Sequence, residues 1–103
     1  MGFQIVWTAS ALQELKEICE YIAEDDPGAA SRVGNELVNH VGILESFPQI
    51  GPVYPPCGDP NVREILCLNF RIFYQISQER KLIEILHLWH GARDEPKGKD
   101  LRI

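Results

Sequence analysis

The chain has 103 residues, of which 45% are apolar and 24% are charged, and its net charge is −5. Domains usually hold about 100–150 residues, so we expect residues 1–103 to form a single domain. The apolar fraction argues against a disordered chain, and no apolar run approaches the roughly 20 residues that span a bilayer. We predict no signal peptide, because no basic segment precedes an apolar stretch. Three irregularly spaced cysteines suit a reducing cytoplasm better than a disulfide framework.

The charge is unevenly distributed along the chain. Residues 1–50 contain two basic and eight acidic side chains, whereas residues 51–103 contain eight basic and seven acidic ones. Nucleic-acid binders usually carry excess positive charge, because phosphate neutralisation supplies much of their affinity. The net charge therefore argues against such a binder, and any site that handles an anion is expected in the second half. We expect the acidic first half to form solvated helix faces.

The first half predicts a strand and two helices. Residues 3–8 are β-branched and aromatic, as is typical of a strand. Ser10 and Gln13 have capping-box spacing, and Asp26 before Pro27 predicts the N-cap of a second helix. The apolar stripes at helical spacing are Ala11, Leu15, Ile18, Cys19 and Ile22, then Ala30, Val33, Leu37, Val41 and Leu44, closed by Phe47. The glutamates expected to face solvent are Glu14, Glu17, Glu20 and Glu24. Together these segments predict an αα-hairpin.

The second half predicts a loop and three strands. Residues 48–61 are so rich in proline and glycine that we expect no regular element there. Strands are predicted at residues 62–68, 70–77 and 82–89, with a hairpin around Asn69 and a turn at residues 78–81. In the last strand, Ile83, Ile85, His87 and Trp89 should face one way, and Leu82, Glu84, Leu86 and Leu88 the other. The polar tail from Gly91 is expected to pack loosely. The order β-α-α-β-β-β predicts a two-layer α+β fold, with the helical hairpin packed on an antiparallel sheet.

Few residues carry recognisable chemistry. The chain has no Cys-x-x-Cys, and His87 and His90 should lie on opposite faces of a strand, so we predict no metal site and no other cofactor. No nucleophile elbow, phosphate loop or dinucleotide fingerprint is present. The cysteines, including Cys67 between two leucines, are expected to be small buried residues.

Basic and aromatic side chains on the predicted sheet remain as candidates. Arg63, Arg71 and Arg93 could bind phosphate or carboxylate through the planar guanidinium, and His90 could exchange a proton near neutral pH. Alternatively, each arginine covers the sheet with its stem and pairs with a surface acid. Two aromatic positions, Tyr74 and Trp89, either form a surface for another chain or belong to the core.

Several short motifs, in order and at consistent spacing, resemble the RelE/ParE superfamily of small toxins from type II toxin–antitoxin modules. In the helical half they are Trp7-Thr8-x-x-Ala11-x-x-Glu14-Leu15, Tyr21-Ile22-Ala23-x-x-x-Pro27-x-Ala29-Ala30 and Phe47-Pro48-x-x-Gly51. In the strand half they are Val62-Arg63-Glu64, Phe70-Arg71-Ile72-Phe73-Tyr74 and Leu88-x-His90-Gly91-Ala92-Arg93-Asp94. The resemblance covers nearly the whole chain and implies a helical hairpin on an antiparallel sheet, in agreement with the pattern of elements.

The resemblance also implies a growth-inhibiting toxin that a cognate antitoxin neutralises. In the RelE-like branch, toxins cut messenger RNA on the ribosome with basic residues and often a C-terminal tyrosine. In the ParE-like branch, they inhibit DNA gyrase. Here the tyrosine position falls near Lys99, and Cys67 and Leu68 stand where a cleaving member has a basic residue. The sequence thus favours the ParE-like branch and a plasmid-stabilisation role.

The site residues follow from that preference. Arg63, Arg71, Tyr74, Trp89 and Arg93 are expected to bind the target or the antitoxin, and His90 and Arg93 would be catalytic only in a RelE-like toxin. The alternatives are a ribosome-dependent endoribonuclease and an inactive binding protein with the toxin fold. A homodimer and a toxin–antitoxin hetero-oligomer are both compatible with the sequence.

Overall fold

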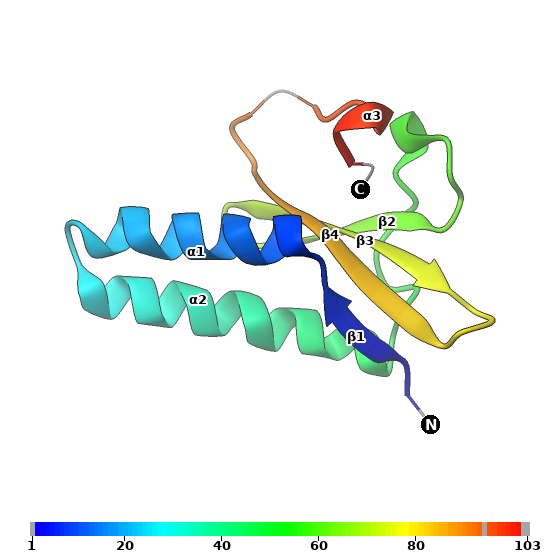
Figure 1. Cartoon of the computed structure of the whole chain (residues 1–103), viewed down its shortest axis with the longest axis horizontal. Coiled ribbons are helices and arrows are strands. Elements are labelled where there is room, and N and C mark those ends of the chain that lie inside the picture. Colours follow the sequence, from blue (N-terminus) through cyan, green and yellow to red (C-terminus); the bar gives the residue numbers. More distant parts are fainter. Residues whose placement is uncertain (1, 94, 102–103) are drawn as a thin grey trace.

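A computed structural model describes residues 2–93 and 95–101. The helices are α1 (Ala9–Ala23), α2 (Pro27–Gly42) and the short α3 (Gly98–Leu101). The strands are β1 (Gln4–Trp7), β2 (Val62–Cys67), β3 (Phe70–Ser77) and β4 (Leu82–His90). Single 3₁₀ turns follow α2 at Ile43–Glu45 and interrupt the long loop at Pro55–Cys57. The helical hairpin lies against one side of the sheet, and α3 lies near the loop that precedes β2 (Figure 1).

The four strands have the order β1-β4-β3-β2. Strands β2, β3 and β4 form the predicted antiparallel meander, but β1 pairs with β4 in parallel, so the sheet is mixed. The prediction of a wholly antiparallel sheet is wrong for β1. A tight turn forces neighbouring strands to be antiparallel, but β1 is connected to the meander through the helical hairpin and is free of that constraint. The two-layer α+β fold is confirmed. Both faces of β4 pack against apolar side chains, which explains its nearly continuous apolar sequence.

The two helix starts test the capping predictions. Asp26 is the N-cap of α2, where its carboxylate accepts from the backbone N–H of Ala29 and Pro27 begins the helix, as predicted. The predicted capping box at Ser10 is wrong, because α1 begins earlier and Thr8 is its N-cap. The Thr8 side chain accepts from the N–H of Ala11 and donates to the carbonyl of Ile85. The cap therefore also joins the helix to the central strand.

One hydrophobic cluster lies between the helices and the sheet. Its buried members include Leu37, Ile72 and Ile85, each with 0% of its surface exposed. A side-chain atom at Gly34 would lie 3.0 Å from the Sγ of Cys19, so this glycine lets the two helices approach closely. Phe47 does not close the apolar stripe as predicted. It is 63% exposed, because α2 gives way to a 3₁₀ turn before reaching it.

A second cluster covers the other side of the sheet. Its buried residues come from the long loop, the strands and α3: Tyr54, Val62, Phe73, Leu86, Trp89 and Leu101. The tail is therefore not loosely packed over residues 95–101, because Leu101 and Pro96 are almost fully buried. The loop holds one 3₁₀ turn and one bridge between Val53 and Arg63, where no regular element was predicted. The sequence signal for this packing is the apolar side chains in the loop and the tail, which follow no regular period.

A bulge divides β4 into two halves. Tyr74 pairs with Ile85, but the preceding Phe73 pairs with His87, so β4 has one extra residue there. The extra residue reverses the alternation, and Leu88 joins the helix-side cluster while Trp89 joins the second one. The predicted faces are correct up to Leu86 and wrong beyond it. Within the described residues, no helix is long and apolar enough to cross a membrane.

Candidate partner-binding groove

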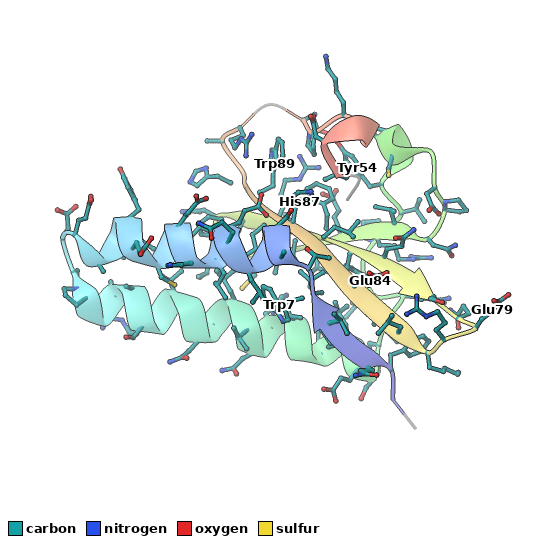
Figure 2. The ribbon with its side chains drawn as sticks, viewed as in Figure 1. Trp7, Tyr54, Glu79, Glu84, His87 and Trp89 are labelled. Carbon is teal, nitrogen blue, oxygen red and sulfur yellow. The ribbon has the colours of Figure 1, made fainter. Side chains whose placement is uncertain are left out.

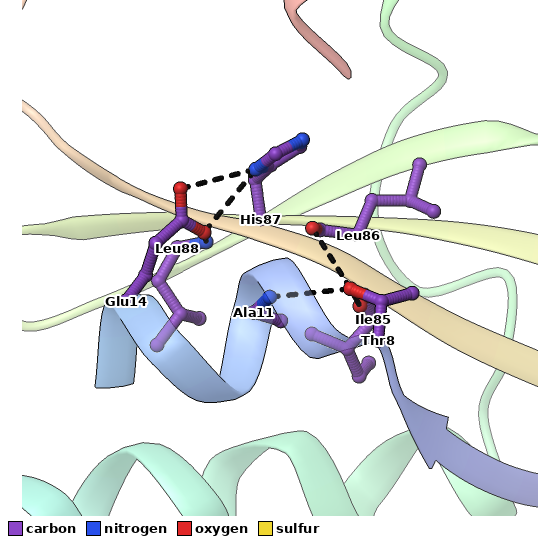
Figure 3. Close-up of polar contacts among 7 residues, drawn as sticks. All are labelled: Thr8, Ala11, Glu14, Ile85, Leu86, His87 and Leu88. Atoms are coloured by element: carbon purple, nitrogen blue, oxygen red, sulfur yellow. Dashed lines mark hydrogen bonds and ion pairs between the residues drawn. The ribbon is translucent and has the colours of Figure 1, made fainter. Parts of the chain in front are cut away.

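The first turns of α1 are fastened to the part of β4 that extends beyond β1 (Figure 3). Glu14 accepts a hydrogen bond from the backbone N–H of Leu88 at 3.0 Å, and its two oxygens lie 3.2 and 3.1 Å from Nδ1 of His87. Thr8, the N-cap six residues earlier, donates to the carbonyls of Ile85 and Leu86. Leu88 lies beyond the part of β4 that pairs with β1, so Glu14 satisfies a strand N–H that has no neighbouring strand there. Glu14 therefore faces the sheet, and its predicted place among the solvent-facing glutamates is wrong.

Beside this junction lies an open groove with a volume of about 720 Å³. Most of its lining is apolar and comes from the two long helices, the β2–β3 turn and the end of β4. The apolar residues are Ile18, Tyr21, Ile22, Val33, Leu68, Phe70 and Leu88, and the polar ones are Glu14, Glu17, Asn69, His90 and Arg93. Tyr21 is 76% exposed and Leu68 is 56% exposed. An apolar floor with a few charges at its margin is suited to binding another polypeptide.

His90 and Arg93 lie together at the rim of this groove. The backbone N–H of Ala92 donates to Nδ1 of His90, and the N–H of Arg93 donates to the His90 carbonyl. Because Nδ1 accepts, a neutral His90 carries its proton on Nε2 and offers a donor to a ligand. The guanidinium carbon of Arg93 lies 3.7 Å from the centre of the Trp89 ring. This stacking orients the exposed arginine at the end of β4.

The other two candidate arginines contact groups of the chain itself. Arg63 donates to the carbonyl of Gly51 at 2.6 Å and so fastens the long loop to β2. A side chain at Gly51 would overlap the Glu64 carbonyl, which explains a glycine at this position of the motif. Arg71 forms ion pairs with Glu64 at 2.7 Å and with Glu95 at 2.6 Å. Arg71 thus pairs with acidic side chains, whereas Arg63 contacts a backbone carbonyl.

The two aromatic candidates belong to the core. Tyr74 is 0% exposed; its hydroxyl donates to the Pro48 carbonyl and accepts from the N–H of Gly51. Burial raises the pKa of this hydroxyl, so it remains a donor. Trp89 is 7% exposed and packs in the second cluster, on the same side of the sheet as Tyr54, whereas Trp7 lies on the helix side (Figure 2).

Sequence reasoning missed a polar network around Tyr54. This buried hydroxyl lies 2.6 Å from the Pro96 carbonyl and 3.0 Å from the carboxylate of Glu95. Burial, reinforced by Glu95, raises the pKa of Tyr54 to about 12. A lone tyrosine inside a proline-rich loop was the only signal in the sequence. The motif residue Asp94 lies outside the described residues.

Among residues 2–93 and 95–101, no group of three His, Cys, Asp or Glu side chains converges. Cys67 is buried as predicted, and burial raises the pKa of its thiol. Cys19 and Cys57 are only partly buried.

One family model and two toxins match this chain over most of its length. Residues 5–95 match the family model of the ParE toxin of the type II toxin–antitoxin system parDE. The putative toxin Y4kP of Sinorhizobium fredii is 34% identical over 86 residues, which are 82% of this chain and 86% of that protein. Toxin RelE2 of Caulobacter vibrioides is 30% identical over 91 residues, which are 87% of this chain and 97% of that protein.

A solved structure shares the fold. The chromosomal ParDE toxin–antitoxin system from P. aeruginosa contains a chain that superposes with a TM-score of 0.70 at 23% identity, covering 85% of this chain and 95% of that one. The common architecture is the pair of helices on a four-stranded mixed sheet described above. Together with the family match, this shows that the chain belongs to the ParE family of toxins from type II toxin–antitoxin systems, within the RelE/ParE superfamily.

Proposed function

We propose that this toxin acts in the cytoplasm as a ParE-like inhibitor of DNA gyrase, and that a cognate antitoxin neutralises it. The gyrase assignment rests on where the basic side chains lie and what they contact. Arg63 and Arg71 do not line the groove, and the Glu64 carboxylate beside the Arg71 guanidinium disfavours a phosphate there. Cleavage of RNA needs a base, an acid and positive charge near the phosphate. Among the described candidates, only His90 and Arg93 share the groove.

A supercoiling assay with purified gyrase tests this assignment. Micromolar toxin should inhibit supercoiling or trap cleaved DNA, and Arg93→Ala should weaken that effect, because it removes the exposed cation at the end of β4. Leu12→Ala is the matched control, since Leu12 is 53% exposed on α1 and does not line the groove. Unaltered supercoiling at micromolar excess would contradict the proposal. Expression of the folded protein without growth arrest would instead favour an inactive binding protein.

The groove supports an antitoxin as the binding partner. The P. aeruginosa neighbour is a ParDE toxin–antitoxin system, and the groove here offers the apolar floor that an amphipathic segment needs. Tyr21→Ala should lower the affinity for the cognate antitoxin by about tenfold, because exposed aromatic side chains dominate such interfaces. Leu12→Ala should leave the affinity unchanged. Equal loss in both variants would place the antitoxin elsewhere on the helix.

A ribosome-dependent endoribonuclease is the second candidate. Its support is the proximity of His90 and Arg93 and the similarity to toxin RelE2. With Nδ1 accepting from the N–H of Ala92, a neutral His90 presents Nε2–H as a hydrogen-bond donor that can stabilise charge on a phosphate oxygen. Primer extension on translated messages should then show cuts in the ribosomal A site that disappear with His90→Ala. Intact messages during growth arrest would remove this candidate.

A further inference from the structure

Arg71 is the centre of a polar cluster outside the groove. Its Nε and Nη2 bind one carboxylate oxygen of Glu64 at 2.8 and 2.7 Å, and its Nη1 binds Glu95 at 2.6 Å. The guanidinium carbon lies 5.4 Å from the ring centre of Tyr54 and 5.2 Å from that of Phe73. Only 13% of the Arg71 side chain is exposed. The strand, the rings and Glu64 therefore fix the direction in which Nη1 points.

The two carboxylates around Arg71 differ in how firmly they are held. Glu64 belongs to β2 and is 20% exposed, whereas Glu95 belongs to the tail and is 68% exposed. Tyr54 has one hydroxyl proton and two acceptors, the Pro96 carbonyl at 2.6 Å and Glu95 at 3.0 Å. The proton is shared between these two acceptors, so the Glu95 side chain can rotate away while the bond to the Pro96 carbonyl holds the tail backbone in place. Glu95 is therefore a replaceable occupant of a fixed site.

We propose that Nη1 of Arg71 and the hydroxyl of Tyr54 form a carboxylate-binding site, which Glu95 fills in the free protein and an acidic side chain of a protein partner fills in the complex. The proposal extends the proposed function by naming the group that the antitoxin or target presents here. The partner's carboxylate would make the same two contacts that Glu95 makes. A phosphate dianion is disfavoured, because Glu64 stays within 2.7 Å of the same guanidinium.

The protonation states suit this exchange. Hydrogen bonds from Arg71 and then from Tyr54 lower the pKa of Glu95, so the occupant is an ionised carboxylate at neutral pH. Burial raises the pKa of Tyr54 to about 12, so the hydroxyl keeps its proton. Binding of a second carboxylate then needs no change in protonation. It needs only the departure of the first.

Removal of Glu95 gives a direct test. The full chain and its Glu95→Gln variant are titrated at constant ionic strength with a hexapeptide of alternating Gly and Glu, while the Arg71 Nε–H resonance is followed by ¹⁵N NMR. A tethered competitor acts at a millimolar effective concentration, so Glu95→Gln should bind the peptide at least about tenfold more tightly than the wild type. Lys97→Gln, an exposed change in the same tail, should bind like the wild type.

Several outcomes would overturn the proposal. These are equal affinity in the wild type and Glu95→Gln, equal binding of a Gly-Gln peptide, or a larger response to inorganic phosphate than to the acidic peptide. Tyr54→Phe in the Glu95→Gln background should weaken binding, because it removes the second donor. All of these measurements use purified toxin without gyrase or cells. If the toxin does not inhibit gyrase in the supercoiling assay, this test of the carboxylate site is unaffected. If the carboxylate site fails its test, the gyrase assignment is unaffected.

Discussion

The helical hairpin covers one face of the sheet with two regular apolar stripes, whereas the other face is covered by a proline-rich loop and the end of the chain. On the first face most buried contacts are apolar, and polar contacts are made by Thr8, Glu14 and Tyr74. On the second face, Arg71 and Tyr54 hold irregular segments through hydrogen bonds and ion pairs. Regular segments can be held by apolar periodicity alone, but irregular ones need individual polar bonds to satisfy their backbone groups.

Truncation of a buried side chain on each face should give the largest effects. We expect Ile85→Ala to lower the free energy of unfolding by about 3–4 kcal/mol, because Ile85 is fully enclosed between helices and sheet. Leu101→Ala should cost about 2 kcal/mol, since a four-residue helix at the chain end can relax into the gap. Urea denaturation of both variants measures the difference. Equal losses would show that the second face is packed as rigidly as the first.

A second comparison of the two faces removes one buried tyrosine hydroxyl from each and measures the loss of stability. Tyr74→Phe should cost about 2 kcal/mol, because it leaves the N–H of Gly51 without its acceptor and frees the Pro48 carbonyl. Tyr54→Phe should cost about 1 kcal/mol, because it removes a donor and leaves only acceptors unpaired. Hydrogen exchange should quicken in the loop for the first variant and in residues 95–101 for the second. The reverse order of stability would contradict this account.

Glu14 tests the polar edge of the helix-covered face. Glu14→Ala should cost about 1–2 kcal/mol, because the N–H of Leu88 loses its acceptor. Glu14→Gln retains an oxygen for this bond and should cost less than about 0.5 kcal/mol. Chemical denaturation gives both values. If the two variants were equally unstable, the charge rather than the hydrogen bond would join α1 to β4.

The smallest effect at neutral pH concerns the titration of Tyr54. Its pKa rises from 10.0 in the unfolded chain to about 12 in the folded protein, so between these values only the folded state keeps the proton. Stability should therefore fall as pH rises from 10 towards 12. Tyr54→Phe should lose this part of the decline, while Tyr74, whose pKa is also raised, still contributes in both proteins. Identical slopes in stability-against-pH curves would show that Tyr54 titrates normally.

The sequence by itself determined the segments whose pattern repeats. Helical spacing located both long helices, alternation located three strands, and Asp26 with Pro27 marked a helix start, because each signal depends only on near neighbours along the chain. The resemblance carried by the short motifs placed the chain in its superfamily before the fold was known. The structure explains why two motif positions hold these residues: Thr8 bonds to the central strand, and a side chain at Gly51 would overlap the Glu64 carbonyl.

Only the tertiary structure decided which distant groups meet. The parallel pairing of β1 and the contacts of Glu14 with Leu88 and Tyr54 with Pro96 join residues separated by about 40 to 80 positions. The bulge in β4 depends on how two neighbouring strands pair. No local pattern encodes such pairs, since a glutamate on a helix looks solvent-facing until a strand end needs an acceptor beside it. The same holds for the arginines, because whether a guanidinium can bind a partner depends on which carboxylates of the folded chain lie beside it.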